Sequence, residues 1–326
     1  MPKDEIAEII KKLKTPRITV CRRSIDKKRK KESCTLWFEL SDLQLGTKFS
    51  TDETVLNEHN WDVWRSKLQV WKFAVIEKIE RNSRDYNIDT VIIACLGDMV
   101  DGDDIYFGHG NYIDAFVVDQ ALQGAVDLAG ALIEIFLSFP QINFQILEVF
   151  GNHGRIGKKE EKPYRNSMDK VFQRFVHAQI QVVKSITNVK YYFNESWIYL
   201  INLYGWNHLL MHGDRGINKI KHRKPSFESI ERTFVEYSNM LQTNIHFLHC
   251  GHFHSDWQIS INMTHFLING SWVGTDILSS QQMVTASPAI QVMHVFTRRE
   301  GLVKTERIHL DTGVVKKALN PTVVFA

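Results

Sequence analysis

Five short motifs built from metal-ligand side chains occur along this chain, each at the end of an apolar run that is typical of a β-strand. Asp, Asn, Gln and His side chains on successive strand ends are what a pair of divalent cations needs as a cage. This order of strand and ligand constrains the fold and the site together. The motifs are Asp42-Leu43-Gln44, Gly97-Asp98-Met99-Val100-Asp101, Gly151-Asn152-His153, Met211-His212-Gly213-Asp214 and Gly251-His252-Phe253-His254.

Strand and helix patterns alternate in the first part of the chain, and strands dominate its end. The run 91–96 is apolar on both faces, which is typical of a buried parallel strand. Apolar residues at intervals of three and four between Trp61 and Ile79 predict a helix with one apolar stripe. These patterns predict an α/β fold, a sandwich of two sheets flanked by helices. Strands are expected at 36–40, 91–96, 144–150, 191–203, 206–211, 245–249 and in the tail 255–326, and helices at 61–79, 112–138, 166–185 and 226–242.

The chain is expected to form one domain over residues 32–326, preceded by a basic arm over residues 1–31. No repeat, low-complexity tract or Gly/Ser linker divides it. No apolar stretch approaches the roughly 20 residues of a membrane helix, and the N-terminus lacks the continuous apolar core of a secretory signal. Four widely spaced cysteines without a Cys-x-x-Cys pair suit a reducing compartment. We therefore expect a cytoplasmic location and no membrane partner.

The net charge of +3 is small, but Lys and Arg are concentrated in three clusters. The first lies within residues 1–31, and the other two directly follow the motifs of His153 and His212. Cations clustered beside a hydrolytic site would attract a polyanion through counterion release, so nucleic acid is the expected partner. The alternative interpretation is a solvated basic surface. The second cluster is Arg155, Lys158, Lys159, Lys162 and Arg165, and the third is Arg215, Lys219, Lys221, Arg223 and Lys224.

The ligand-type residues can be divided between two metal ions. Asp98, at the end of a central strand, is the candidate for a carboxylate that bridges both ions. His252 and His254 lie at i and i+2 on one side of an extended segment, so both can face the cleft. Oxygen and imidazole ligands without a thiolate favour manganese, iron or zinc, with manganese as the first expectation. The ligand candidates are Asp42, Asp98, Asn152, His212, His252 and His254.

A metal pair of this kind would hydrolyse a phosphoester without a protein nucleophile. Two cations roughly 3.5–4 Å apart would activate a bridging water and clamp the phosphoryl oxygens in the in-line transition state. The absence of a Gly-x-Ser-x-Gly elbow and of a Walker loop fits this chemistry. His153, beside Asn152, is in a position to protonate the leaving oxygen or to stabilise its charge.

The motifs resemble those of the calcineurin-like metallophosphoesterase superfamily, whose blocks read Asp-x-His, Gly-Asp-x-x-Asp, Gly-Asn-His-Asp/Glu, His and Gly-His-x-His. The resemblance spans Asp42 to His254, about two-thirds of the chain, and implies a two-sheet metallophosphoesterase sandwich. It implies His153 as the acid-side catalytic residue, with Asp98 and Asp101 as the other catalytic candidates. The implied ligands are Asp42, Gln44, Asp98 and His254 for one metal, and Asp98, Asn152, His212 and His252 for the other.

Two positions depart from the family pattern. Gln44 stands where the family usually has His, and its amide oxygen is a harder, weaker ligand than imidazole, which favours manganese or a looser site. Gly154 stands where an acidic partner for His153 is usual. Another carboxylate would then have to orient the His153 ring. The candidates are Asp101, Asp103 and Asp104.

Sequence details also distinguish branches of the superfamily. Ser/Thr protein phosphatases carry Gly-Asp-x-x-Asp-Arg-Gly and Gly-Asn-His-Glu, whereas here Gly102-Asp103 and Gly154-Arg155 follow, which disfavours that branch. The Gly-Asp-x-Val-Asp-Gly form is similar to that of SbcD-like repair nucleases and of the small subunit of archaeal DNA polymerase D. We expect the 72 residues that follow His254 to close the second sheet rather than to form a separate capping domain. The compact form also looks like metallophosphoesterases of tailed bacteriophages, for which the host cytoplasm is the expected location.

Three functions stay open at this point. The first is a metal-dependent phosphodiesterase acting on DNA or RNA, with Arg155, His109 and Arg215 as candidate substrate contacts. The second is a hydrolase of small phosphodiesters such as cyclic nucleotides or dinucleotides. The third, suggested by Gln44 and Gly154, is a degenerate module that binds nucleic acid or protein without turnover. The remaining histidines match no motif and are expected on the surface or as satisfied core residues, and a homodimer stays open.

Overall fold

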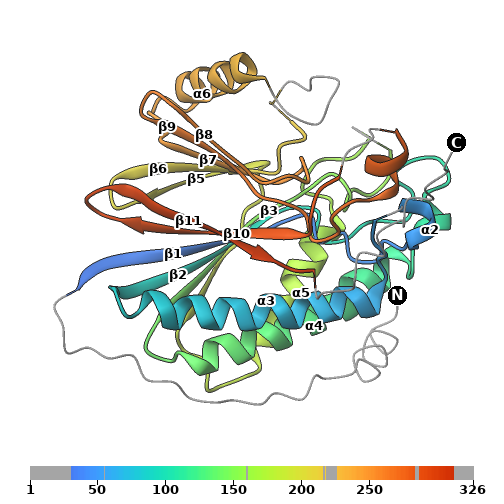
Figure 1. The fold of residues 1–326 in the computed structure, drawn as a ribbon, viewed down its shortest axis with the longest axis horizontal. Helices are drawn as coiled ribbons and strands as arrows, with labels where there is room; N and C mark the ends of the chain where they lie inside the picture. Colours follow the sequence, from blue (N-terminus) through green and yellow to red (C-terminus); the bar gives the residue numbers. More distant parts are fainter. Residues whose placement is uncertain are drawn as a thin grey trace, which may run out of the picture.

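Two β-sheets lie face to face in the computed structural model, with helices on the outer face of each sheet (Figure 1). The structure describes residues 31–54, 56–158, 161–215, 217, 226–282 and 286–311. The arrangement confirms the predicted α/β fold, a two-sheet sandwich flanked by helices. Of the expected basic arm only Lys31 is described, so the division into an arm and one domain stays a prediction.

The first sheet is built around four parallel strands. β1 to β4 follow one another across the sheet, and β10 and β11 extend it antiparallel on the other side of β1. Because parallel strands end on the same side, the loops after β1, β2 and β3 leave the sheet at one edge. In the order of the sheet, the strands are β11 (Gly301–His309), β10 (Ile290–Thr297), β1 (Glu32–Leu40), β2 (Tyr86–Leu96), β3 (Asn143–Val149) and β4 (Val189–Tyr192).

Three long helices cover the outer face of the first sheet (Figure 1): α3 (Trp61–Asn82), α4 (Val117–Ser138) and α5 (Met168–Gln181). The side chain of Asn60 accepts a hydrogen bond from the Val63 N–H and so caps the start of α3. The predicted apolar stripe of this helix is confirmed, because Trp64 and Trp71 are buried in the core between the helices and the sheet. α4 packs against both α3 and α5.

Helix α4 overturns one expectation. By length and composition this 22-residue helix could cross a membrane, so the expectation that no apolar stretch approaches that length is wrong. In the fold, 72% of its most apolar 18-residue window is buried. Ala125 and Phe136, for example, belong to the core beneath the first sheet. The apolar character of α4 is therefore explained by its packing against α3, α5 and the first sheet.

The second sheet has five strands, and α6 (Phe227–Leu241) covers its outer face (Figure 1). β6, β7 and β9 are parallel, so the segments after β6 and β7 leave at a shared edge. In the order of the sheet, the strands are β5 (Ile198–Leu203), β6 (Trp206–Met211), β7 (Phe247–Cys250), β9 (Thr264–Ile268) and β8 (Trp257–Ile261). The short elements are α2 (Thr51–Thr54), η1 (His109–Tyr112) and η2 (Leu278–Gln282).

The layer between the two sheets contains polar side chains as well as apolar ones. Side chains alternate along β1, so Leu36 and Phe38 face the helices while Trp37 faces the second sheet. Glu39, two residues after Trp37, reaches across this layer to a histidine of β7. Carboxylate and imidazole side chains therefore occur inside the strands as well as in the loops that follow them.

Candidate metal centre

The loops after β1 and β2 are joined by backbone hydrogen bonds at the edge of the first sheet. The N–H of Asp42 donates to the carbonyl of Gly97 (3.1 Å), and that of Gln44 donates to the carbonyl of Asp98 (3.0 Å). These pairs hold the first two motifs side by side. The seven ligand-type residues at this edge are called the strand-edge site: Asp42, Gln44, Asp98, Asn152, His212, His252 and His254.

Much of this site is built on strained backbone. Five of its residues have φ angles in the left-handed region, where non-glycine residues are uncommon. Each such residue costs free energy that the surrounding structure has to offset, and residues of this kind concentrate at functional sites. The five are Asp42 (φ 50°), Gln44 (φ 38°), Asp98 (φ 53°), His252 (φ 69°) and His254 (φ 51°).

Glycines in the motifs permit the close approach of one loop to another. A Cβ atom at Gly151 would lie 2.0 Å from Oδ1 of Asp98, and one at Gly251 would lie 2.4 Å from Oδ2 of Asp42. No side chain fits at either position. The glycines of the third and fifth motifs are thus required by the packing of the two aspartates.

Asp98 lies at the centre of the strand-edge site. Its Oδ1 accepts a hydrogen bond from the His153 N–H (2.7 Å), and its Oδ2 lies 3.0 Å from Nε2 of His212. Nδ1 of His212 contacts the Leu96 carbonyl at 2.8 Å, so Nδ1 carries a proton and donates it. Burial acts to lower the pKa of His212, but the Asp98 carboxylate outweighs it and raises that pKa to about 10 in the metal-free chain. A cation between these two groups would take the place of the second ring proton.

Asp42 and the last motif form the other half of the site. Both carboxylate oxygens of Asp42 accept from the His252 N–H, at 3.0 and 3.1 Å, and Nε2 of His254 lies 3.4 Å from Oδ1. Nδ1 of His254 lies 3.3 Å from Oδ2 of Asp276, a residue that the sequence gave no reason to select. A carboxylate behind an imidazole fixes the orientation of the ring, as is usual for metal-ligating histidines.

The side chains present fit a divalent cation. Oδ1 of Asn152 is buried and has no hydrogen-bond partner in the described structure, and Nε2 of His212 is buried against the Asp98 carboxylate at 3.0 Å. Ligand atoms of Asp98, His212 and His252 lie within 4.8 Å of one another. Buried polar atoms without partners are costly unless something else satisfies them. Carboxylate, amide and imidazole donors are the ligands that divalent transition metals accept.

His153 is oriented by a carboxylate from the second motif. Its Nδ1 lies 3.0 Å from Oδ1 of Asp101 and 2.9 Å from the Asp101 carbonyl. Burial acts to lower the pKa of His153, but Asp98 and Asp101 outweigh it and raise the pKa to about 9. Among the three carboxylates that the sequence offered for this role, Asp101 makes the contact.

Gly154 is explained by a lack of space. A Cβ atom there would lie 2.7 Å from Oγ of Ser167 and 2.8 Å from the backbone nitrogen and Oδ1 of Asp169. An acidic side chain at this position cannot be accommodated in this structure. Its absence therefore does not indicate a degenerate site, since Asp101 supports His153 from another loop.

The structure corrects the predicted role of His109. Its side chain is only 1% exposed, stacked under the ring of Tyr106, so it does not face the cleft. Nδ1 of His109 accepts from the Ile105 N–H (3.2 Å), and Nε2 lies 2.9 Å from Oδ2 of Asp101. The contacts of His109 make it a positioning residue that holds the Asp101 carboxylate against His153.

Asp169 is a second residue that sequence reasoning missed. It is fully buried in the first turn of α5, and its carboxylate accepts from the N–H groups of Asp98 (2.9 Å), Met99 (3.0 Å), Val100 (3.3 Å) and Gly151 (2.8 Å). Burial and the nearby Asp98 raise its pKa to about 6. One carboxylate thus fixes the loops after β2 and β3 in relation to each other.

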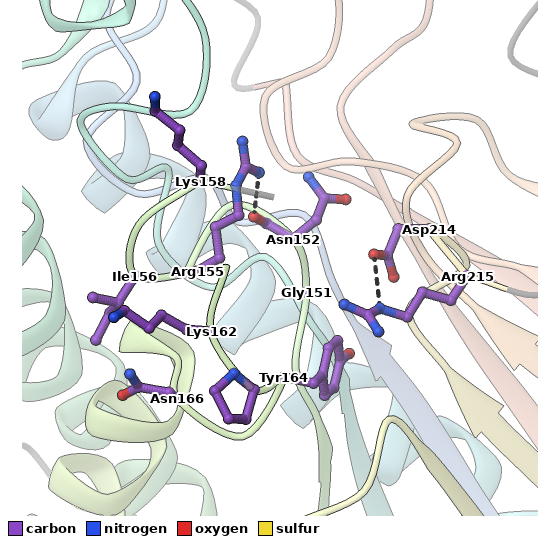
Figure 2. A pocket seen from close by; sticks show the side chains of 11 residues that line it. Gly151, Asn152, Arg155, Ile156, Lys158, Lys162, Tyr164, Asn166, Asp214 and Arg215 are labelled. Atoms are coloured by element: carbon purple, nitrogen blue, oxygen red, sulfur yellow. Dashed lines mark hydrogen bonds and ion pairs between the residues drawn. The ribbon is translucent and has the colours of Figure 1, made fainter. Parts of the chain in front are cut away.

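A cavity of about 220 Å³ opens beside Asn152 (Figure 2). The guanidinium of Arg155 is held at its rim by the carbonyls of Asn152 (2.8 Å) and Ile105 (2.6 Å). Across the cavity, the Arg215 guanidinium lies 5.0 Å from the Tyr164 ring centroid. The structure thus brings together members of the second and third basic clusters: Arg155, Lys158, Lys162 and Arg215. Lys159, Lys219, Lys221, Arg223 and Lys224 lie outside the described residues.

Comparisons give relatives of the fold only. No protein-family model and no curated protein matches the chain. It is similar to Vps29 from Entamoeba histolytica complexed with Zn²⁺, at 12% identity and a TM-score of 0.31, covering 85% of this chain and 99% of that one. A predicted phosphoesterase from Streptococcus pneumoniae is similar at 11% identity and a TM-score of 0.29, with 85% of this chain and 98% of that chain covered. A novel archaeal phosphodiesterase is similar at 9% identity and a TM-score of 0.32, with 84% of this chain and 99% of that chain covered. Values this low carry no information on activity, so the function has to follow from the side chains of this chain.

Proposed function

We propose that this protein is a divalent-metal-dependent phosphodiesterase that hydrolyses nucleic acid. The main support is the convergence of carboxylate, amide and imidazole groups at the common edge of two sheets, where the buried Oδ1 of Asn152 lacks a hydrogen-bond partner in the described structure and Nε2 of His212 faces the Asp98 carboxylate. Asp42, Gln44, Asp98 and His254 would hold one ion, and Asp98, Asn152, His212 and His252 the other. When bound, such ions supply Lewis-acid polarisation of a phosphoryl group and a water that loses its proton near neutral pH.

The proposed acid is His153. Asp101 holds Nδ1 of the ring, so Nε2 is the nitrogen left to exchange a proton with a substrate. This nitrogen lies 3.3 Å from the side-chain amide nitrogen of Gln44, so it faces the strand-edge site. In the metal-free chain Asp98 and Asp101 raise the pKa of His153 to about 9, and a protonated ring is what protonation of a leaving oxygen requires.

The cavity beside Asn152 indicates the class of substrate. Its lining has four cationic side chains and only one carboxylate, that of Asp214. This excess of positive charge attracts a phosphate-rich ligand. At about 220 Å³ it is smaller than the roughly 300–1,000 Å³ of pockets that enclose a drug-sized ligand. It therefore suits one unit of a longer chain, with Tyr164 and Arg215 offering an aromatic and a planar cationic surface to a base or sugar.

The proposal is tested by cleavage assays with manganese on single-stranded, double-stranded and circular DNA, on RNA and on bis-p-nitrophenyl phosphate. His153→Ala is the inactive variant, and His309→Ala, which changes an exposed histidine of β11, is the matched control. We expect polymer cleavage by the wild type and the control and its loss in His153→Ala. Cleavage of the small diester alone would point to a small-molecule phosphodiesterase. Silence on every substrate would favour a binding module and contradict the proposal.

A further inference from the structure

A second group of metal-ligand side chains lies inside the sandwich. Glu39 of β1, His249 of β7 and His294 of β10 bring a carboxylate oxygen and two ring nitrogens within 4.8 Å of one another. We call these three residues the interior cluster. Their exposed fractions are 0%, 0% and 2%. The cluster joins the two sheets, because β1 and β10 belong to the first and β7 to the second.

Both imidazoles of the interior cluster turn a ring nitrogen toward Glu39. Nδ1 of His249 lies 2.6 Å and Nε2 of His294 lies 3.4 Å from Oε1 of Glu39. The opposite ring nitrogens are also held: Nε2 of His249 lies 2.9 Å from Nδ1 of His208, and Nδ1 of His294 lies 2.9 Å from Oγ1 of Thr305. A second contact at the far nitrogen is the usual arrangement of an imidazole that binds a metal.

One atom of the cluster lacks the partner that its burial demands. Oε2 of Glu39 is buried and makes no hydrogen bond within the described part of the chain, whereas Nε2 of His294 has the 3.4 Å contact with Oε1 of Glu39. The surroundings are apolar and aromatic: the ring of Trp37 stacks on His249 at 4.5 Å, and Phe296 also packs against that ring. A polar atom in such surroundings costs free energy unless it is paired.

The three side chains of the interior cluster are of types that bind a divalent cation. Two imidazoles turned toward one buried carboxylate are a ligand set of the two-histidine, one-carboxylate kind.

We propose that the interior cluster binds one Zn²⁺ ion that ties the two sheets together. Zinc accepts imidazole and carboxylate ligands in a four-coordinate shell, and two ring nitrogens with both oxygens of Glu39 provide four donors. Because the side chains are buried from solvent, the site would be structural and separate from hydrolysis at the strand edge. It does not depend on the proposed phosphodiesterase activity.

The test is the zinc content of the full chain after the strand-edge site has been disabled. Asp98→Asn combined with His212→Asn removes two central ligands of that site and leaves the interior cluster intact. After passage over a chelating resin, we expect about one zinc per chain in this double variant by mass spectrometry. Adding Glu39→Gln should remove that zinc. Adding His265→Gln, which changes a histidine of β9 outside the cluster, should retain it.

Two results would overturn the proposal. The first is a folded double variant, verified by circular dichroism, that contains no zinc, in which case the cluster is a hydrogen-bonded ion pair. The second is zinc that persists after both Glu39→Gln and His294→Gln. If the Glu39→Gln chain fails to fold, X-ray absorption of the zinc-loaded double variant decides instead: a first shell of two imidazoles and carboxylate oxygen supports the site, and a thiolate-containing shell rejects it.

Discussion

The strand-edge site and the interior cluster use the same side-chain types and share two strands, but their backbones differ. β1 provides Glu39 to the interior cluster and leads to Asp42 at the edge, and β7 provides His249 and leads to His252. Five of the seven residues of the strand-edge site have φ angles in the left-handed region, whereas Glu39 and His249 lie within regular strands. Loops that leave the strands place ligands, an acid and a cavity together. Strand interiors fix ligands without giving a substrate access. Position along a strand, rather than residue type, therefore separates the proposed catalytic arrangement from the proposed structural one.

The largest effect is expected for Asp98→Ala. Its carboxylate is the shared ligand of both proposed ions, so both should leave, and activity should fall by more than the 10²–10⁴-fold of a lost general acid. Metal analysis and the nuclease assay measure the two effects. Zinc in the interior cluster should remain, which separates the two regions. Retention of full metal content would mean that Asp98 does not bridge the ions.

His153→Ala should reduce kcat by roughly 10²–10⁴-fold while the metal content stays that of the wild type. The variant removes a proton donor and no proposed ligand. Steady-state kinetics and metal analysis on one preparation distinguish this outcome from loss of metal. A variant that loses metal in proportion to activity would place His153 among the ligands instead.

Asp101→Asn should reduce kcat by about 10–100-fold, the usual effect of changing a residue behind a functional imidazole. The carboxylate also helps to raise the pKa of His153 to about 9. His153 is therefore protonated below that pH and loses its proton as the pH rises through it. In the chelated Asp101→Asn chain, this loss should occur at lower pH, as nuclear magnetic resonance of the ring can measure. An unchanged titration would assign the shift to Asp98 alone.

Gly154→Ala should lower the free energy of unfolding by about 1–3 kcal/mol, because the added methyl group meets Ser167 and Asp169 at under 3 Å. Gly110→Ala is the matched control, since a Cβ atom there would approach only the Asp103 carbonyl, at 3.8 Å. Urea denaturation of both variants measures the difference. Equal stability of the two variants would show that the strand edge is less tightly packed than the structure indicates.

The smallest effect is expected for Lys162→Ala in the cavity lining. Loss of one phosphate contact should weaken polymer binding modestly and reduce the slope of log K against log salt by about one. Fluorescence anisotropy at several salt concentrations measures the slope. An unchanged slope would place Lys162 outside the path of the substrate, and the interior cluster should be unaffected in either case.

The sequence predicted the parts of the molecule that combine a motif with a periodic pattern. Strands followed by Asp42, Asp98 and His212 were recognisable because an apolar run and a ligand occur together. Asp169 was not recognisable from the sequence, because acidic residues are common in the first turn of any helix, where they interact favourably with the helix dipole. Asp276 lies in a loop without any pattern.

Two other features required distances that a sequence does not contain. Gly154 was interpreted as a missing acid, although the observed cause is steric. His208, His249 and His294, expected on the surface or as satisfied core residues, are buried and lie together between the sheets. Their only sequence signal is a polar residue at an inward position of an apolar strand, and it says nothing about which strands meet.

Asp169 has a consequence for how the strand-edge site is assembled. Its carboxylate gathers N–H groups from the loops after β2 and β3, yet it belongs to α5. The ligand geometry and the docking of this helix are therefore thermodynamically linked, and a metal affinity measured for the chain includes the free energy of docking α5. By reciprocity, metal binding should slow amide hydrogen exchange throughout α5, including turns that lie far from any ligand.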